Sequence, residues 1–104
     1  MSLASARKAL DDTVHSPVRF TLMSALASVD QADYQTLKEA LDVSYALLSK
    51  HAAILEQAGY VRITKQFVGR TPRTDLALTR AGRAAYAAHL AALDEIVRGL
   101  AASP

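Results

Sequence analysis

The sequence contains no cysteine and no tryptophan, and only four glycines and three prolines among its 104 residues. Without cysteine, the chain can form neither disulfides nor thiolate metal clusters. The sequence also lacks an apolar run near the ~20 residues that cross a bilayer, and it lacks the apolar region of a signal peptide. We therefore expect one intracellular, cytoplasmic domain over residues 1–104. Its core should be aliphatic, because aromatic residues make up only 6% of the chain.

Positive charge is concentrated in one short segment. Residues 62–83 hold six basic side chains and one acidic side chain, whereas the rest of the chain holds six basic and nine acidic ones. A positive field confined in this way is typical of a surface that contacts a polyanion. The alternative is that these are solvated charges on a strand pair and a helix start, and charge alone does not separate the two.

Hydrophobic periodicity predicts five helices, at residues 3–14, 17–28, 34–41, 44–58 and 80–101. Capping residues precede the last four helices: Ser16 followed by Pro17, then Asp33, Ser44 and Thr79. The third and fourth helices are separated only by the turn at residues 42–44. Two helices joined by so short a turn form a helix-turn-helix.

Beyond Gly59 the hydrophobic period changes from 3.6 to 2, which predicts a β-hairpin. Residues 67–73 contain a glycine, a proline and two arginines, and we expect them to form its loop. The predicted fold is therefore mainly α with a small β-hairpin. Its element order is that of a winged helix-turn-helix with an additional N-terminal helix and a long C-terminal helix.

Five stretches of the sequence resemble winged-helix regulators of the MarR/ArsR type, in particular the small winged helix DNA-binding domain family of transcription regulators. They are HSPVR (15–19), LSKH (48–51), LEQAGYV (55–61), FVGRTPRT (67–74) and LTRAGR (78–83). The resemblance implies a winged-helix core over residues 15–83. The sequence departs from the family at Asp42, where glycine is common, at Lys50, where arginine is more frequent, and at Ala52, where leucine usually packs.

The predicted helix at residues 44–58 has the outer face expected of a recognition helix. That face is small and polar, and it carries one cation, so it can approach base edges in a major groove that is about 12 Å wide. Solvent exposure alone is the alternative explanation for such a face. The candidate DNA-binding residues on this helix are Ser44, Tyr45, Ala46, Ser49, Lys50 and Ala53.

The hairpin at residues 62–78 is expected to act as a wing on the minor groove or the DNA backbone. Arg70, Thr71 and Arg73 lie in its predicted loop, where we expect both arginines to be far from the core. Pro72 stiffens this loop, so less entropy is lost when the arginines bind. Arginine is a frequent contact of narrow minor grooves. A merely soluble hairpin tip is the alternative.

These features predict a sequence-specific double-stranded DNA-binding transcriptional regulator. The alternative is a winged-helix protein–protein interaction module that does not bind DNA. We expect no enzyme activity and no cofactor, because no catalytic constellation or phosphate-binding loop is present. We also expect no metal site, since His89 does not share a helical face with the carboxylates at 94 and 95. A small-molecule effector of unidentified chemistry stays open.

The first and last helices (residues 3–14 and 80–101) are expected to form a homodimer interface. A two-fold dimer is the usual partner of a palindromic operator. Alternatively, the last helix packs on residues 3–14 of its own chain and the protein is a monomer. The candidate interface residues are Leu3, Leu10, Tyr86, Leu90, Leu93, Val97 and Leu100.

Overall fold

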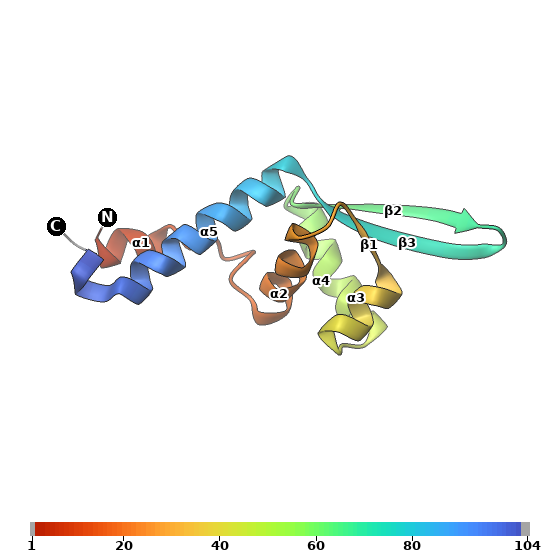
Figure 1. Ribbon diagram of the computed structural model, residues 1–104, viewed down its shortest axis with the longest axis horizontal. Helices are drawn as coiled ribbons and strands as arrows, with labels where there is room; N and C mark the ends of the chain where they lie inside the picture. The colour runs from red at the N-terminus through yellow and green to blue at the C-terminus, as the bar shows by residue number, and fades with distance from the viewer. Residues whose placement is uncertain (1, 103–104) are drawn as a thin grey trace.

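The computed structural model describes residues 2–102 and shows three parts along one axis (Figure 1). A cluster of three helices lies in the centre, a long hairpin extends to one side, and the longest helix extends to the other. The predicted fold class is confirmed. In chain order the elements are α1 (Leu3–Lys8), α2 (Pro17–Ala27), β1 (Ala32–Asp33), α3 (Tyr34–Leu41), α4 (Tyr45–Gln57), β2 (Val61–Val68), β3 (Thr71–Leu78), α5 (Arg80–Arg98) and the 3-10 helix η1 (Gly99–Ala102).

The helix starts follow the predicted capping residues. The side chain of each cap accepts a hydrogen bond from the backbone N–H three residues later, at Ser16, Asp33, Ser44 and Thr79. Such a cap stabilises a helix by about 1 kcal/mol. Asp42 ends α3 in the left-handed conformation, with φ 52° and ψ 55°. The helix-turn-helix therefore forms without the family's usual glycine.

The N-terminal segment differs from the prediction. The helix predicted over residues 3–14 ends at Lys8, and residues 9–16 form a linker. One oxygen of the Asp11 carboxylate accepts hydrogen bonds from the N–H groups of Thr13 and Val14, which competes with helix formation. Val14 is consequently buried in the central core instead of lying on a helix face, and Leu10 is a half-buried linker residue.

The hairpin is longer and its turn tighter than predicted. β2 and β3 pair from Val61–Leu78 out to Val68–Thr71, so the turn consists of Gly69 and Arg70 alone. Gly69 has φ 65°, which suits a two-residue hairpin turn. The loop predicted over residues 67–73 is therefore wrong. Pro72 is tolerated within β3 because it lies on an open edge of the sheet.

A third strand, β1, was not predicted. It pairs antiparallel with β3, giving the sheet order β1-β3-β2, and its two residues face Leu76 and Asp75. A strand of two residues is too short to show a period of 2. It nevertheless joins the base of the hairpin to the start of α3.

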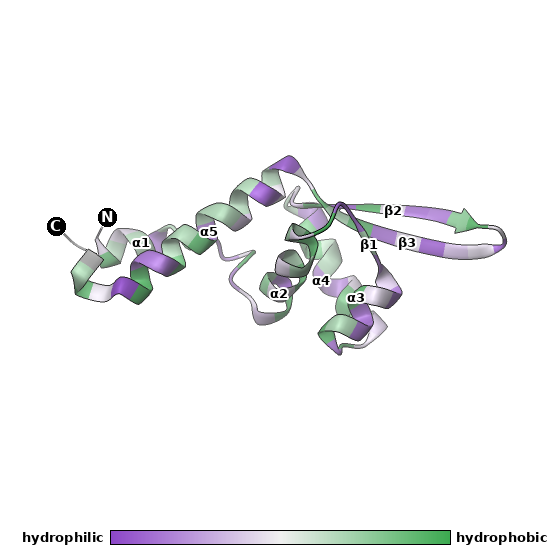
Figure 2. Ribbon diagram, in the orientation of Figure 1, coloured by the Kyte–Doolittle hydropathy of each residue, from purple (hydrophilic) through white to green (hydrophobic). Residues whose placement is uncertain are grey.

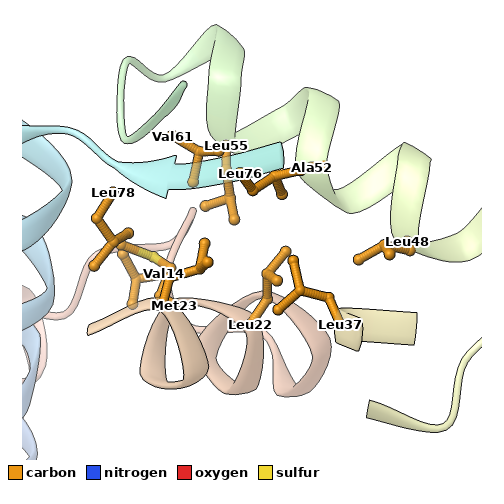
Figure 3. Close-up of a cluster of buried hydrophobic side chains, with 11 residues drawn as sticks. Val14, Leu22, Met23, Leu37, Leu48, Ala52, Leu55, Val61, Leu76 and Leu78 are labelled. Atoms are coloured by element: carbon orange, nitrogen blue, oxygen red, sulfur yellow. The ribbon is translucent and has the colours of Figure 1, made fainter. Parts of the chain in front are cut away.

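The core is aliphatic, as predicted, and lies where α2, α3 and α4 meet the base of the sheet (Figure 3). Full burial of one leucine side chain is worth about 1.5–3 kcal/mol. No helix of residues 2–102 combines the length and apolar character that crossing a membrane requires. The largest apolar side chains of the core are Leu22, Met23, Leu26, Leu37, Leu48, Leu55 and Leu76.

Gly82 fixes the start of α5 against the hairpin base. A Cβ atom at this position would lie 2.0 Å from the backbone oxygen of Tyr60, so only glycine allows the approach. The N–H of Thr79 donates to that same oxygen at 3.0 Å, and the Thr79 hydroxyl donates to the carbonyl of Gly59 at 2.6 Å. The direction of α5 is thereby set relative to α4 and β2.

A buried histidine joins α5 to the linker. Nδ1 of His89 accepts the backbone N–H of Asp11 at 3.1 Å, and its Nε2 lies 3.2 Å from Nδ1 of His15. The Asp11 carboxylate in turn accepts the hydroxyl of Tyr60 at 2.5 Å. Burial, reinforced by the neighbouring His15, lowers the pKa of His89. The neutral imidazole is therefore the form that holds this junction.

We expect the free energy of unfolding to decrease as the pH falls below about 6.5, the ordinary histidine pKa in the unfolded chain. The folded state binds fewer protons because the pKa of His89 is lowered, so acid favours unfolding. His89→Asn offers an uncharged acceptor to the Asp11 N–H and should reduce this dependence. Urea midpoints near pH 7.5 and 5.5 measure it.

His51 should account for part of the pH dependence of stability that remains in His89→Asn, because burial also lowers the pKa of His51. An identical pH dependence in wild type and His89→Asn would contradict the proposed role of His89.

Candidate nucleic-acid interface

The outer face of α4 is open to solvent because the opposite face is buried. Leu48, Ala52 and Leu55 pack into the core, which turns the other side of the helix outward. Of the six candidate residues on this helix or its cap, Ser49 is half-buried at the edge of the outward side. The other five are exposed on that side, and Tyr45 is 59% exposed. They are Ser44, Tyr45, Ala46, Lys50 and Ala53.

A groove separates α4 from the hairpin. It measures about 570 Å³, and its walls are formed by Tyr45, Ser49, Ala53 and Glu56 on α4 and by Ile63 and Lys65 on β2. Lys65 was counted in the basic segment of the sequence but was not predicted as a site residue. The position of Lys65 in the groove follows from the residue-by-residue pairing of β2 with β3. The predicted loop at residues 67–73 did not specify that pairing.

A second hollow continues this groove toward the starts of α3 and α4. It measures about 630 Å³ and extends from Tyr34, Lys38 and Tyr45 to Pro72 and Arg73. The rings of Tyr34 and Tyr45 lie 5.5 Å apart between centroids. Burial raises the pKa of Tyr34, so its hydroxyl stays protonated and can donate a hydrogen bond. Tyr34 was not among the DNA-binding residues predicted from the sequence.

Arg73 does not lie free at the hairpin tip, and the prediction for this residue is corrected. Its Nε donates to Oδ1 of Asp75 at 2.9 Å, and its Nη2 lies 3.9 Å from Oδ2 of Asp33. Asp75 is only 2% exposed, and its other oxygen accepts the side-chain amide of Gln66 at 2.8 Å. The ion pair with Asp75 raises the pKa of Arg73. Arg73 therefore connects β3 to β2 and β1.

Arg70 is placed as the sequence predicted. It occupies the two-residue turn, and within residues 2–102 it forms no ion pair and no side-chain hydrogen bond. Thr71 follows it and is also exposed. The outermost cation of the hairpin is thus available to a partner.

The three histidines do not contribute to this interface. Nδ1 of His51 lies 3.0 Å from Nη1 of Arg19, and Nε of Arg19 donates to the carbonyl of Thr13. His51 is thus held against Arg19 of α2, while His15 and His89 contact each other. Across residues 2–102, no three histidine, aspartate or glutamate side chains are grouped closely enough to hold a metal ion.

We predict that Arg73 and Arg70 differ in their effect on stability. Arg73→Ala leaves the buried carboxylate of Asp75 without its cation, which should lower the urea midpoint. Arg70→Ala removes an unpaired surface charge and should change the free energy of unfolding by no more than about 0.5 kcal/mol. Circular dichroism during urea denaturation measures both variants. Equal midpoints for the two would show that the Arg73–Asp75 pair does not stabilise the hairpin.

Comparison with known proteins relates this arrangement to regulators. The model of the family described as "winged helix DNA-binding domain" matches residues 18–97. An uncharacterized protein of Methanocaldococcus jannaschii is 28% identical over 72 residues, covering 69% of this chain and 78% of that protein. The structure of a transcriptional regulator homologue from Pyrococcus horikoshii is similar at a TM-score of 0.84 and 28% identity, covering 94% of this chain and 95% of the other.

A structure of overoxidized AbfR bound to DNA shares the fold. Its TM-score is 0.73 at 20% identity, and the match covers 86% of this chain and 65% of that chain.

Proposed function

The chain belongs to the winged helix DNA-binding domain family and is a DNA-binding transcriptional regulator, and we propose how it contacts DNA. α4 enters the major groove with Tyr45, Ser49 and Lys50 at the base edges. The hairpin β2–β3 follows the adjacent minor groove or backbone with Arg70. The membership agrees with the resemblance found in the sequence. We propose a binding protein, not an enzyme, located in the cytoplasm with the DNA it binds.

The open face of α4 with three cations around it is the observation that carries this proposal, and Glu56 is the one carboxylate that lines the groove. Lys65 lines the groove, Lys50 lies on the exposed face of α4 and Arg70 occupies the end of the hairpin. The hairpin's one carboxylate, Asp75, is buried and paired with Arg73, so it does not repel phosphates. Positive side chains that neutralise phosphates supply much of the affinity of such proteins.

Selection of duplexes from a random pool tests the proposal. We expect an enriched palindrome, because a two-fold dimer binds two half-sites about 34–36 Å apart. Arg70→Ala should weaken binding to all duplexes and lower the salt slope of log K by about 1, whereas Lys50→Ala should change the preferred bases. Fluorescence anisotropy at several salt concentrations measures the slope.

Arg7→Ala is the matched control, since it removes the same charge from α1 at the opposite end of the molecule (Figure 1). Light scattering should show an unchanged mass, since α1 also belongs to the dimer interface proposed below, and the variant should then bind like wild type. If no duplex is enriched and Arg70→Ala equals Arg7→Ala, the DNA-contact proposal is wrong and the protein–protein alternative gains support.

We further propose a homodimer through α1, α5 and η1. Val97 and Leu100 are both 83% exposed, and Leu3 and Leu90 are also exposed on this end of the molecule. α1 packs along α5 within the chain, as one of the two sequence alternatives stated, but this contact leaves those side chains uncovered. Leu93 is half-buried beside them.

Tyr86 does not belong to this surface, and its assignment to the interface is corrected. Its ring stacks on Phe20 at 5.8 Å between centroids, and its hydroxyl donates to Oγ of Ser24 at 2.9 Å. Both partners lie on α2 of the same chain, so Tyr86 joins α5 to the central core. The helical spacing that placed it in line with Leu90 does not distinguish these two roles.

Val97→Asp should convert the dimer to a monomer, because it introduces a charge into the apolar contact. Ala88→Asp is the matched control: it lies on the opposite side of α5, about 180° around the helix at ~100° per residue. Light scattering after size exclusion gives the mass of each. A monomeric wild type, or equal masses for both variants, would contradict the proposed interface.

A small-molecule effector stays a proposal without an assigned site. A hollow of about 200 Å³ lies at the start of α2 and is lined by His15, Ser16, Pro17 and Phe20. Its walls offer few polar groups, so they do not indicate a ligand class.

A further inference from the structure

The outer end of the hairpin is apolar. Phe67 is 73% exposed and Val68 is 58% exposed, and neither belongs to the core or to the side chains packed against it. Figure 2 shows this segment as the hydrophobic end of β2, beyond a polar stretch of the same strand. Phe67 lies far from the core and does not stabilise it by packing. Its exposed ring is therefore available to a binding partner.

Phe67 lies on the same face of β2 as two residues that line the groove, although Phe67 itself lines neither the groove nor the second hollow. Alternate residues of a strand share a face, so Phe67 is on the side of Ile63 and Lys65, which line the groove beside α4. Phe67 also pairs directly with Pro72, and paired side chains stand next to each other on one face. Pro72 lines the second hollow together with Tyr45. At about 3.3 Å per residue, Phe67 lies ~7 Å farther along the hairpin than Lys65.

We propose that Phe67, supported by Pro72, inserts between base pairs in the minor groove beside the half-site and kinks the duplex. This inference rests on the proposed function and deepens it. Proteins that bend DNA through the minor groove use apolar side chains as such wedges. Pyrimidine–purine steps unstack most readily, so the protein should prefer them at this position without forming hydrogen bonds to the bases.

Charge complementarity favours duplex DNA over an apolar protein partner. Lys65 and Arg70 flank Phe67 along the hairpin, and the carboxylate of Asp75 is buried beneath Arg73. An aromatic ring flanked by these two cations suits a polyanion that also offers stacked bases.

The hairpin is also stiff enough to hold a wedge in place. The strands remain paired up to the residues that flank the two-residue turn. Asp75 connects Arg73 of β3 with Gln66 of β2 through its two oxygens. Both of these side chains lie on the face opposite Phe67, so the brace leaves the ring free.

The test uses the duplex that wild type enriches from a random pool. Energy transfer between dyes at its two ends measures bending, and 2-aminopurine beside the half-site reports unstacking through increased fluorescence. We expect wild type to bend the duplex and to raise the 2-aminopurine signal. Phe67→Ser should abolish both effects and weaken binding about tenfold. The salt slope should not change, because no charge is removed.

Val29→Ser is the matched control, since it removes an exposed apolar side chain that lies outside the hairpin and lines neither hollow. It should bend DNA like wild type, and Phe67→Leu should retain part of the bend because leucine also serves as a wedge. Both positions are exposed, so unfolding midpoints should stay unchanged and exclude a folding defect.

Three results would overturn the inference. If wild type binds with an Arg70-dependent salt slope but neither bends nor unstacks the duplex, the wedge is wrong while the proposed function stands. If Phe67→Ser changes the molecular mass without DNA, the ring contacts a second copy of the chain instead. If wild type binds no duplex at all, the wedge and the proposed DNA contact fail together.

Discussion

Burial of the inner face of α4 is the contact on which the rest of the molecule depends. Leu48, Ala52 and Leu55 are fully buried against α2 and the base of the sheet, and this fixes which side of α4 points outward. The outer side can then stay small and polar, because the helix needs no further packing there. Position and exposure of the DNA-contacting surface thus follow from the same apolar contact that stabilises the fold.

The hairpin extends this surface through a different interaction, the burial of Asp75. Its carboxylate binds Arg73 and Gln66, which braces the strands and removes the one negative charge of the hairpin from the surface. Arg70 and Lys65 consequently act in a field without an opposing carboxylate on the same hairpin. Arg73 is held in an ion pair with Asp75, whereas Arg70 forms no ion pair within the hairpin, although the sequence contexts of the two arginines look alike.

Much of the fold could be predicted because it depends on local signals. The caps at Ser16, Asp33, Ser44 and Thr79 and the change of period at Gly59 placed most helix starts and the hairpin. The failures came where distant contacts decide. Asp11 ends the first helix early while binding Tyr60 and His89, and β1 forms only because β3 lies beside it. Tyr86 keeps helical spacing with Leu90, yet its hydroxyl binds Ser24 on α2.

The sequence by itself determined the order of the helices and the hairpin and most of the solvent-facing residues of α4, because periodicity and capping are encoded within a few residues. Only the tertiary structure decided which cation is paired, where Lys65 and Phe67 point and which apolar side chains of α5 stay uncovered. These depend on strand register and on partners far along the chain. The physical reason is that charge pairing and burial are properties of positions in space, which residue spacing alone does not specify.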